Sequence, residues 1–124
     1  MTMQKPIVKS KDAPDLGVFS WSDPFYLEQQ LSEEERMLRD ASKNFAQEKL
    51  QPRITKAFQS ETVEPQLFRE MGEMGLLGTT IPEEYGGLGA GYVSYGVVAR
   101  EIERIDSCYR SMMSVQSSLT GLTS

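Results

Sequence analysis

The sequence predicts an all-α protein of five to six helices, with one glycine-rich connector. Apolar residues recur at three- and four-residue spacing in successive segments, and residues suited to helix starts precede several of them. No segment shows the alternation of apolar and polar residues that marks a half-buried strand. A chain of 124 residues fits one domain, so we expect the helices to pack as an orthogonal or bundle-like array.

The first part of the chain is predicted to be an arm followed by a short helix. Residues 1–18 are polar and aperiodic, which is typical of a flexible N-terminal arm, and the domain is expected over residues 19–124. In "WSDPFYLEQQ", Asp23 can cap a helix start and Pro24 suits the first turn. This pattern predicts a helix from about Pro24 to Gln30.

A longer helix is predicted to follow. Ser32 and Glu35 have the spacing of a capping box, and early glutamates suit the positive end of the helix dipole. Pro52 should end or kink this helix, and a further helical stretch should reach about Gln59. Its apolar stripe is predicted to contain Leu31, Met37, Leu38, Ala41 and Phe45.

The next segment, "EPQLFREMGEMG", predicts a helix with Pro65 in its first turn and Gly75 at its C-terminal cap. The connector "LLGTTIPEEYGGLGAGY" then breaks helical order with one proline and five glycines. Two more helices should follow. The first carries the stripe Tyr95, Val98, Ala99, Ile102 and Ile105, and the second carries Met112, Val115, Leu119 and Leu122.

Composition excludes several classes of function. The net charge of −5 disfavours binding to nucleic acid or to anionic membranes, because both need clustered Lys and Arg. The chain has no histidine, which removes Ser-His-Asp triads and most zinc sites. One cysteine, Cys108, cannot form an internal disulfide, and the first residues resemble no targeting signal. We therefore expect a bacterial cytoplasmic protein without a bound metal.

Three candidate motifs have simpler explanations. Gly87, Gly89 and Gly91 do not have the spacing of a nucleotide-binding loop, and no strand precedes them, so we interpret "GGLGAG" as a tight connector. The Glu83-Glu84 pair follows a proline and suits a turn or helix start. Cys108 lacks a base partner, which favours a small packing residue over a reactive thiol.

Arg110 has two interpretations. It can pair with Asp106 four residues earlier on an exposed helix, which would contribute only about 0.3–0.5 kcal/mol. On a helical wheel it also shares a face with Ser114 and Ser117, an arrangement that could grip a carboxylate. Glu103 would lie about 10 Å from Arg110 along a continuous helix and would not touch it.

The sequence resembles the N-terminal helical domain of acyl-CoA dehydrogenases. The blocks "FREMGEMGLLGTTIPEEYGG" and "EIERIDSCYRSMMSVQSSL" carry the resemblance, which covers residues 19–119 and is strongest to glutaryl-CoA dehydrogenases. Cys108 stands where that subgroup usually has glycine. The resemblance implies a flavoprotein that uses FAD to oxidise an acyl-CoA between its α and β carbons. In the glutaryl subgroup, decarboxylation to crotonyl-CoA follows, within lysine and tryptophan degradation.

The resemblance also implies roles for particular residues. Arg110 and Ser111 would bind the distal carboxylate of glutaryl-CoA, with help from Glu103. The family's catalytic base and nearly all its FAD contacts lie beyond residue 124, so the 124-residue chain alone is expected to be inactive. An electron-transfer flavoprotein as acceptor and a homotetramer are implied for the full-length enzyme. The alternatives are a dehydrogenase for an aliphatic acyl-CoA and a non-catalytic helical interaction module.

Overall fold

The computed structural model describes residues 19–120, and for residues 118–120 only the backbone. Between residues 19 and 120 the chain forms helices and turns without a strand, which confirms the all-α prediction. The chain divides into two compact units, residues 1–32 and residues 33–124. The predicted arm, residues 1–18, lies outside the described residues, as does Leu122.

The first helix, α1, spans Leu27–Gln30 and is shorter than predicted. The helix does not begin at Pro24, because the chain makes a turn there and Tyr26 adopts a left-handed conformation with φ 52°. The N-cap residue of α1 is Tyr26 rather than Asp23, although the side chain of Asp23 still contacts the first N–H groups of the helix. Its two carboxylate oxygens accept hydrogen bonds from the backbone N–H groups of Leu27 at 2.8 Å and Glu28 at 2.9 Å.

In the second unit, helix α2 spans Glu33–Phe45 and begins directly after Ser32. A π-helical turn, η1, follows over Ala46–Leu50, and α3 continues over Gln51–Gln59 with Pro52 in its first turn. Proline has no N–H and crowds the preceding turn, so regular α-helical bonding is interrupted just before it. The predicted end or kink at Pro52 takes the form of a π-helical turn just before it, and helical structure continues through Pro52 to Gln59.

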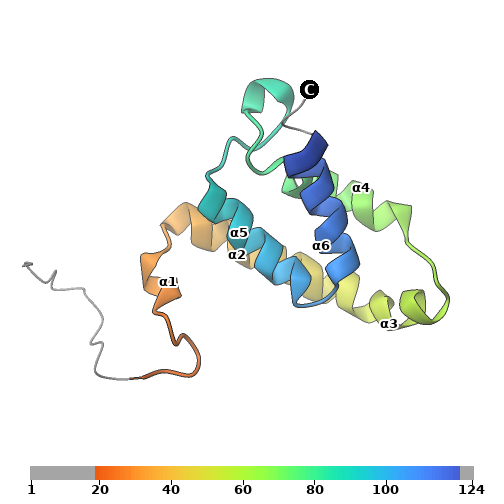
Figure 1. Ribbon diagram of the computed structural model, residues 1–124, viewed down its shortest axis with the longest axis horizontal. Coiled ribbons are helices and arrows are strands. Elements are labelled where there is room, and N and C mark those ends of the chain that lie inside the picture. Colours follow the sequence, from red (N-terminus) through yellow and green to blue (C-terminus); the bar gives the residue numbers. More distant parts are fainter. Residues whose placement is uncertain (1–18, 121–124) are drawn as a thin grey trace, which may run out of the picture. The chain divides into compact units, whose positions relative to one another are not determined.

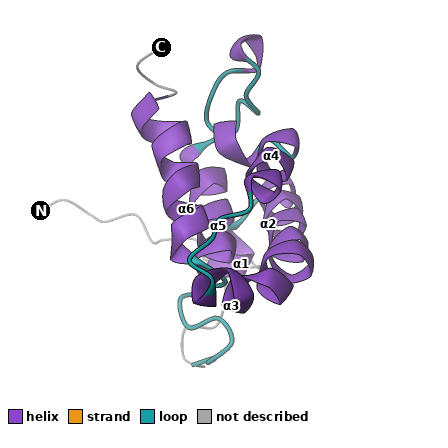
Figure 2. Cartoon of the chain, turned by 90° about the vertical axis from the view of Figure 1, so that its right-hand side faces the viewer, coloured by secondary structure: helices purple, strands orange, loops and turns teal. Residues whose placement is uncertain are grey.

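The buried face of α2 differs from the predicted stripe. Met37 is 67% exposed and Ala41 is also exposed, whereas Leu31 and Phe45 are buried as expected. The face that continues into η1 consists of Ser42, Phe45, Ala46 and Leu50. Helix α5, which spans Tyr92–Glu103, lies beside α2 (Figures 1 and 2). Ser42 donates its hydroxyl to the carbonyl of Leu38 at 2.8 Å, so this small polar residue is satisfied within the packed face.

Helix α4 spans Pro65–Glu73 and ends as predicted, with Gly75 at φ 77°. The connector contains two short 3₁₀ helices, η2 at Leu76–Gly78 and η3 at Glu83–Tyr85. Helix α6 spans Ser107–Ser114 and continues as a π-helical segment, η4, over Val115–Thr120. Between residues 19 and 120, no helix combines the length and apolarity needed to cross a bilayer.

The last helix buries a face that the sequence did not predict. Tyr109, Met113 and Ser117 are buried, whereas Val115 is 47% exposed and Met112 is half-buried. Tyr109 and Met113 lie in α6, and the step from Met113 to Ser117 enters the π-helical segment η4, in which hydrogen bonds join residues five apart. The predicted Leu119 has no described side chain. The core of the second unit is formed by Phe45, Ala46, Leu50, Leu67, Met71, Leu76, Val98, Ile102, Tyr109 and Met113.

Tyr109 ties α6 to the loop before α4. Its hydroxyl accepts a hydrogen bond from the backbone N–H of Glu64 at 3.2 Å, and only 2% of the residue is exposed. Burial raises the pKa of the Tyr109 phenol above its ordinary 10.0. Its contribution to stability is therefore complete below pH 10 and is lost as the pH rises through the higher folded-state value.

We expect Tyr109→Phe to lower the free energy of unfolding by about 1–2 kcal/mol, because it leaves the Glu64 N–H without its partner. Urea denaturation measures this change. Tyr85→Phe is the matched control, since Tyr85 is 77% exposed and should give an unchanged midpoint. Equal stability of the two variants would contradict a structural role for the Tyr109 hydroxyl.

Candidate functional site

The corner between α5 and α6 gathers the candidate site residues. Helix α5 ends at Glu103, and α6 begins at Ser107 after a short turn. Asp106 caps α6, since its Oδ1 accepts a hydrogen bond from the N–H of Tyr109 at 3.0 Å. The carboxylate of Asp106 therefore serves the helix start, and the predicted alternative of an Asp106–Arg110 ion pair is wrong.

Arg110 instead pairs with Glu103. Its Nε donates to Oε2 of Glu103 at 2.5 Å. The expected separation of about 10 Å assumed one continuous helix. That expectation is wrong, because the chain turns between α5 and α6 and brings the two side chains into contact.

Hydroxyl groups extend this pair on both sides. Ser107 donates to Oε1 of Glu103 at 2.6 Å, so both carboxylate oxygens of Glu103 are engaged. On the other side, Nη1 of Arg110 donates to the Ser114 hydroxyl at 3.3 Å, and the Tyr95 hydroxyl donates to the same oxygen at 2.8 Å. We call Glu103, Arg110, Tyr95, Ser107 and Ser114 the arginine network. It joins α5 and α6 through side chains alone.

The helical wheel placed Ser114 correctly and Ser117 incorrectly. Ser117 is buried and donates its hydroxyl to the carbonyl of Leu77 at 2.8 Å, so it does not face Arg110. Sequence reasoning missed Tyr95, which was assigned only to an apolar stripe, and Ser107. The position of Ser107, four residues after Glu103, would have indicated their contact only if the turn between α5 and α6 had been known.

The charges of the pair stabilise each other. Hydrogen bonds from Ser107 and Arg110 lower the pKa of the Glu103 carboxyl below its ordinary 4.5, and the hydrogen bond and charge of Glu103 raise the pKa of Arg110. The side chains are 44% and 35% exposed, respectively. Because the folded-state pKa of Glu103 is lowered, its contribution to stability is present above pH 4.5 and is lost as the pH falls through the lower folded value.

We expect Ser107→Ala to raise the pKa of the Glu103 carboxyl towards its ordinary value, because it removes the largest cause of the shift. Side-chain carbonyl NMR during a pH titration measures the change directly. Ser111→Ala is the matched control, since no hydrogen bond joins Ser111 to Glu103. A pKa of Glu103 that is unaffected by Ser107→Ala would show that the hydroxyl does not hold the carboxylate.

Ser111 lies apart from the arginine network. It lines an apolar cavity of about 390 Å³ together with Phe68, Cys108, Met112, Val115 and Gln116. Of the three predicted site residues, the structure joins Glu103 and Arg110, while Ser111 turns towards this adjacent cavity. Cys108 is exposed at the cavity wall, so its predicted role as a small packing residue is wrong.

The glycine-rich connector uses its backbone N–H groups internally. Gly86, Gly87 and Gly89 donate to the carbonyls of Glu83, Pro82 and Ile81, respectively, and Leu88 and Ala90 donate to Gly78 and Thr79. A phosphate-binding loop needs such groups free to face the ligand. The interpretation of "GGLGAG" as a tight connector is confirmed.

The glycine-rich connector does not by itself offer a site for a flavin. The cavity at the connector measures about 200 Å³, and the N–H groups that would hold a pyrophosphate are occupied within it. Glu83 and Glu84 begin the 3₁₀ helix η3, as expected for carboxylates after a proline. Within residues 19–120, no three His, Cys, Asp or Glu side chains are grouped closely enough to hold a metal ion.

Comparison with known proteins shows the family to which this chain belongs. The sequence profile described as acyl-CoA dehydrogenase, N-terminal domain, matches residues 32–123. The probable acyl-CoA dehydrogenase YngJ of Bacillus subtilis (strain 168) is 37% identical over 73 residues, which are 59% of this chain and 19% of that protein. The mitochondrial short-chain specific acyl-CoA dehydrogenase of Mus musculus is 33% identical over 106 residues, covering 84% of this chain and 26% of that protein.

A solved structure shares the fold of this chain. A chain from a structure titled as the electron transferring flavoprotein of Acidaminococcus fermentans superposes with a TM-score of 0.66 at 30% identity. The match covers 68% of this chain and 22% of that chain. The present chain thus spans about a quarter or less of the length of these relatives. Because the family profile covers helices α2 to α6 and the connector, the chain belongs to the acyl-CoA dehydrogenase family, of which it forms the N-terminal helical domain.

Proposed function

We propose that this chain is the N-terminal domain of an FAD-dependent dehydrogenase whose substrate is glutaryl-CoA. The proposed reaction is α,β-oxidation and decarboxylation to crotonyl-CoA, in lysine and tryptophan degradation. Arg110 binds the distal carboxylate of the substrate, Ser111 donates a further hydrogen bond, and Glu103 orients the guanidinium. The catalytic base and most FAD contacts come from residues outside this chain, so the chain alone has no dehydrogenase activity.

The observation that carries the proposal is the way Arg110 is held. Glu103 fixes its Nε and Ser114 contacts its Nη1, while Nη2 has no hydrogen-bond partner within the described residues. A planar guanidinium fixed on one edge can present its remaining N–H groups to a carboxylate. Ser111, next along α6, opens on an apolar cavity suited to methylene groups. Bringing a distal carboxylate into such surroundings is costly without a fixed cation.

A dehydrogenase for an aliphatic acyl-CoA is the second candidate. One observation favours it: the carboxylate of Glu103 already pairs with the guanidinium of Arg110. Two curated relatives, moreover, are named as short-chain specific and short/branched chain specific enzymes. In that case Arg110 would only stabilise the corner between α5 and α6. A non-catalytic interaction module is the third candidate, and no contact among the described residues favours it.

The test is the substrate profile of the full-length enzyme that contains this chain. We expect kcat/KM for glutaryl-CoA to exceed that for butyryl-CoA by roughly 10²-fold or more, because only the glutaryl chain ends in a carboxylate that can accept from the remaining N–H groups of Arg110. Crotonyl-CoA and CO₂ should form in equal amounts. A preference for butyryl-CoA would reject glutaryl-CoA as substrate and retain family membership.

The remaining features of the proposal concern the whole enzyme. We propose that an electron-transfer flavoprotein accepts electrons from the reduced enzyme. We also propose that the full-length enzyme is a homotetramer in the bacterial cytoplasm and that it binds neither nucleic acid nor membranes. Sedimentation of the full-length enzyme checks the tetramer, and reoxidation of its reduced flavin by purified electron-transfer flavoprotein checks the acceptor.

A further inference from the structure

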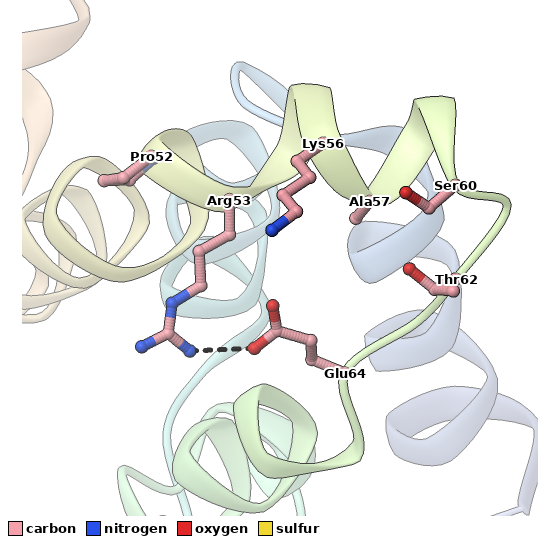
Figure 3. A pocket seen from close by; sticks show the side chains of 7 residues that line it. All are labelled: Pro52, Arg53, Lys56, Ala57, Ser60, Thr62 and Glu64. Atoms are coloured by element: carbon pink, nitrogen blue, oxygen red, sulfur yellow. Dashed lines mark hydrogen bonds and ion pairs between the residues drawn. The ribbon is translucent and has the colours of Figure 1, made fainter.

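A second cavity lies away from the arginine network, between the end of α3 and the loop that leads into α4 (Figure 3). Its volume is about 410 Å³, and its polar walls come from Arg53, Lys56, Ser60, Thr62 and Glu64. Ala57, which is buried, and Pro52 complete the lining. The proposed reaction does not use these residues.

The polar groups converge on one space. Figure 3 shows the Lys56 side chain reaching from α3 into the cavity, with the hydroxyls of Ser60 and Thr62 facing it. Within the described residues, no ion pair or hydrogen bond engages the Lys56 ammonium group or either hydroxyl. All three residues are exposed, so an anion in this open cavity would replace water at three side-chain donors, one of them charged.

Glu64 does not cancel this positive character. Its Oε2 accepts from Nη1 of Arg53 at 2.9 Å, so these two charges compensate each other across the cavity. Lys56 then leaves the lining with a net charge of +1. The C-terminal end of α3 opposes an anion only weakly, because its carbonyls at Lys56 and Ala57 accept hydrogen bonds from the N–H groups of Ser60 and Thr62.

We infer that this cavity binds the oxyanion head group of a small polar ligand. The ammonium group of Lys56 and the hydroxyls of Ser60 and Thr62 each donate to one oxygen of a phosphate or carboxylate. Charge-assisted hydrogen bonds of this kind are roughly twice as strong as neutral ones. The cavity is far larger than a single oxyanion needs, which leaves room for the uncharged remainder of the ligand.

The test follows backbone amide NMR signals of the chain during titration with inorganic phosphate, and separately with acetate, at constant ionic strength. We expect saturable shifts confined to residues 53–64. Lys56→Gln should weaken binding about tenfold, because it removes a charge-assisted hydrogen bond. Lys43→Gln, which makes the same charge change on α2, is the matched control and should bind like the wild-type chain. Tighter binding of phosphate indicates a phosphate-bearing ligand, and tighter binding of acetate indicates a carboxylate.

Glu64→Gln should strengthen anion binding, in contrast to Lys56→Gln. It removes the negative charge from the lining and frees the guanidinium of Arg53, so phosphate should bind several-fold more tightly. Circular dichroism verifies that each variant is folded. The inference is overturned if neither anion gives saturable shifts at residues 53–64, or if Lys56→Gln and Lys43→Gln weaken binding equally.

Discussion

Gly87→Ala should destabilise the second unit by about 3 kcal/mol or more, the largest effect expected for alanine at any glycine that the structure describes. A Cβ at residue 87 would lie 2.0 Å from the carbonyl oxygen of Ile81 and 2.5 Å from its carbonyl carbon. These are backbone atoms, which cannot rotate away as a side chain can. The same carbonyl accepts a hydrogen bond from Gly89 at 2.8 Å, so moving it would break the connector's internal bonding.

Gly96→Ala is the matched control for this prediction. Gly96 lies in α5, and a Cβ there would meet nothing within 4 Å. Alanine in a helix interior is favoured over glycine by roughly 0.5–1 kcal/mol, so this variant should be slightly more stable than the wild-type chain. Urea denaturation compares the two. If Gly87→Ala unfolded at the wild-type midpoint, the close approach between residues 81 and 87 would be wrong.

Arg110→Met in the full-length enzyme should lower kcat/KM for glutaryl-CoA by roughly 10²- to 10³-fold. Methionine keeps the length and apolar volume of the side chain but removes the charge and the N–H donors. The distal carboxylate would then enter an apolar site without a cation. Butyryl-CoA has no such carboxylate, so its kcat/KM should change by less than about tenfold.

Glu103→Gln separates two effects of Glu103 on Arg110, the orientation of its guanidinium and the neutralisation of its charge. The glutamine can still contact Arg110 but no longer neutralises it, so glutaryl-CoA turnover should fall less than in Arg110→Met. The fall in kcat/KM should be larger for glutaryl-CoA than for butyryl-CoA, so the ratio of the two values should decrease. If Arg110→Met and Glu103→Gln lowered the rates for both substrates by the same factor, the arginine network would serve only the structure of the corner.

Local chemistry made most of the fold predictable. Pro52, Pro65 and Gly75 restrict the backbone whatever their surroundings, and each stands at the break, start or end that the sequence predicted. Burial was less predictable. Met37 is apolar yet exposed, because a helix can bury only the face that meets its neighbour, and the sequence does not specify the neighbour.

The sequence pointed to two members of the arginine network but not to its geometry. Arg110 and Glu103 were identified from the resemblance, whereas their contact depends on the turn between α5 and α6. Asp106 could be interpreted as a partner of Arg110 or as a helix cap, and only the backbone distinguishes the two roles. Tyr95 joins the network through its hydroxyl alone, while the rest of its side chain packs against the core as the apolar stripe predicted.

The central claim is that the guanidinium of Arg110 recognises the distal carboxylate of the substrate. A double-mutant cycle between enzyme and substrate tests it most directly, with wild-type and Arg110→Met enzymes each assayed on glutaryl-CoA and on pentanoyl-CoA. The two substrates have five-carbon acyl chains and differ only in a terminal carboxylate or methyl group. We predict that Arg110→Met changes the ratio of the two kcat/KM values by roughly 10²-fold or more. A ratio that is the same in both enzymes would contradict the claim.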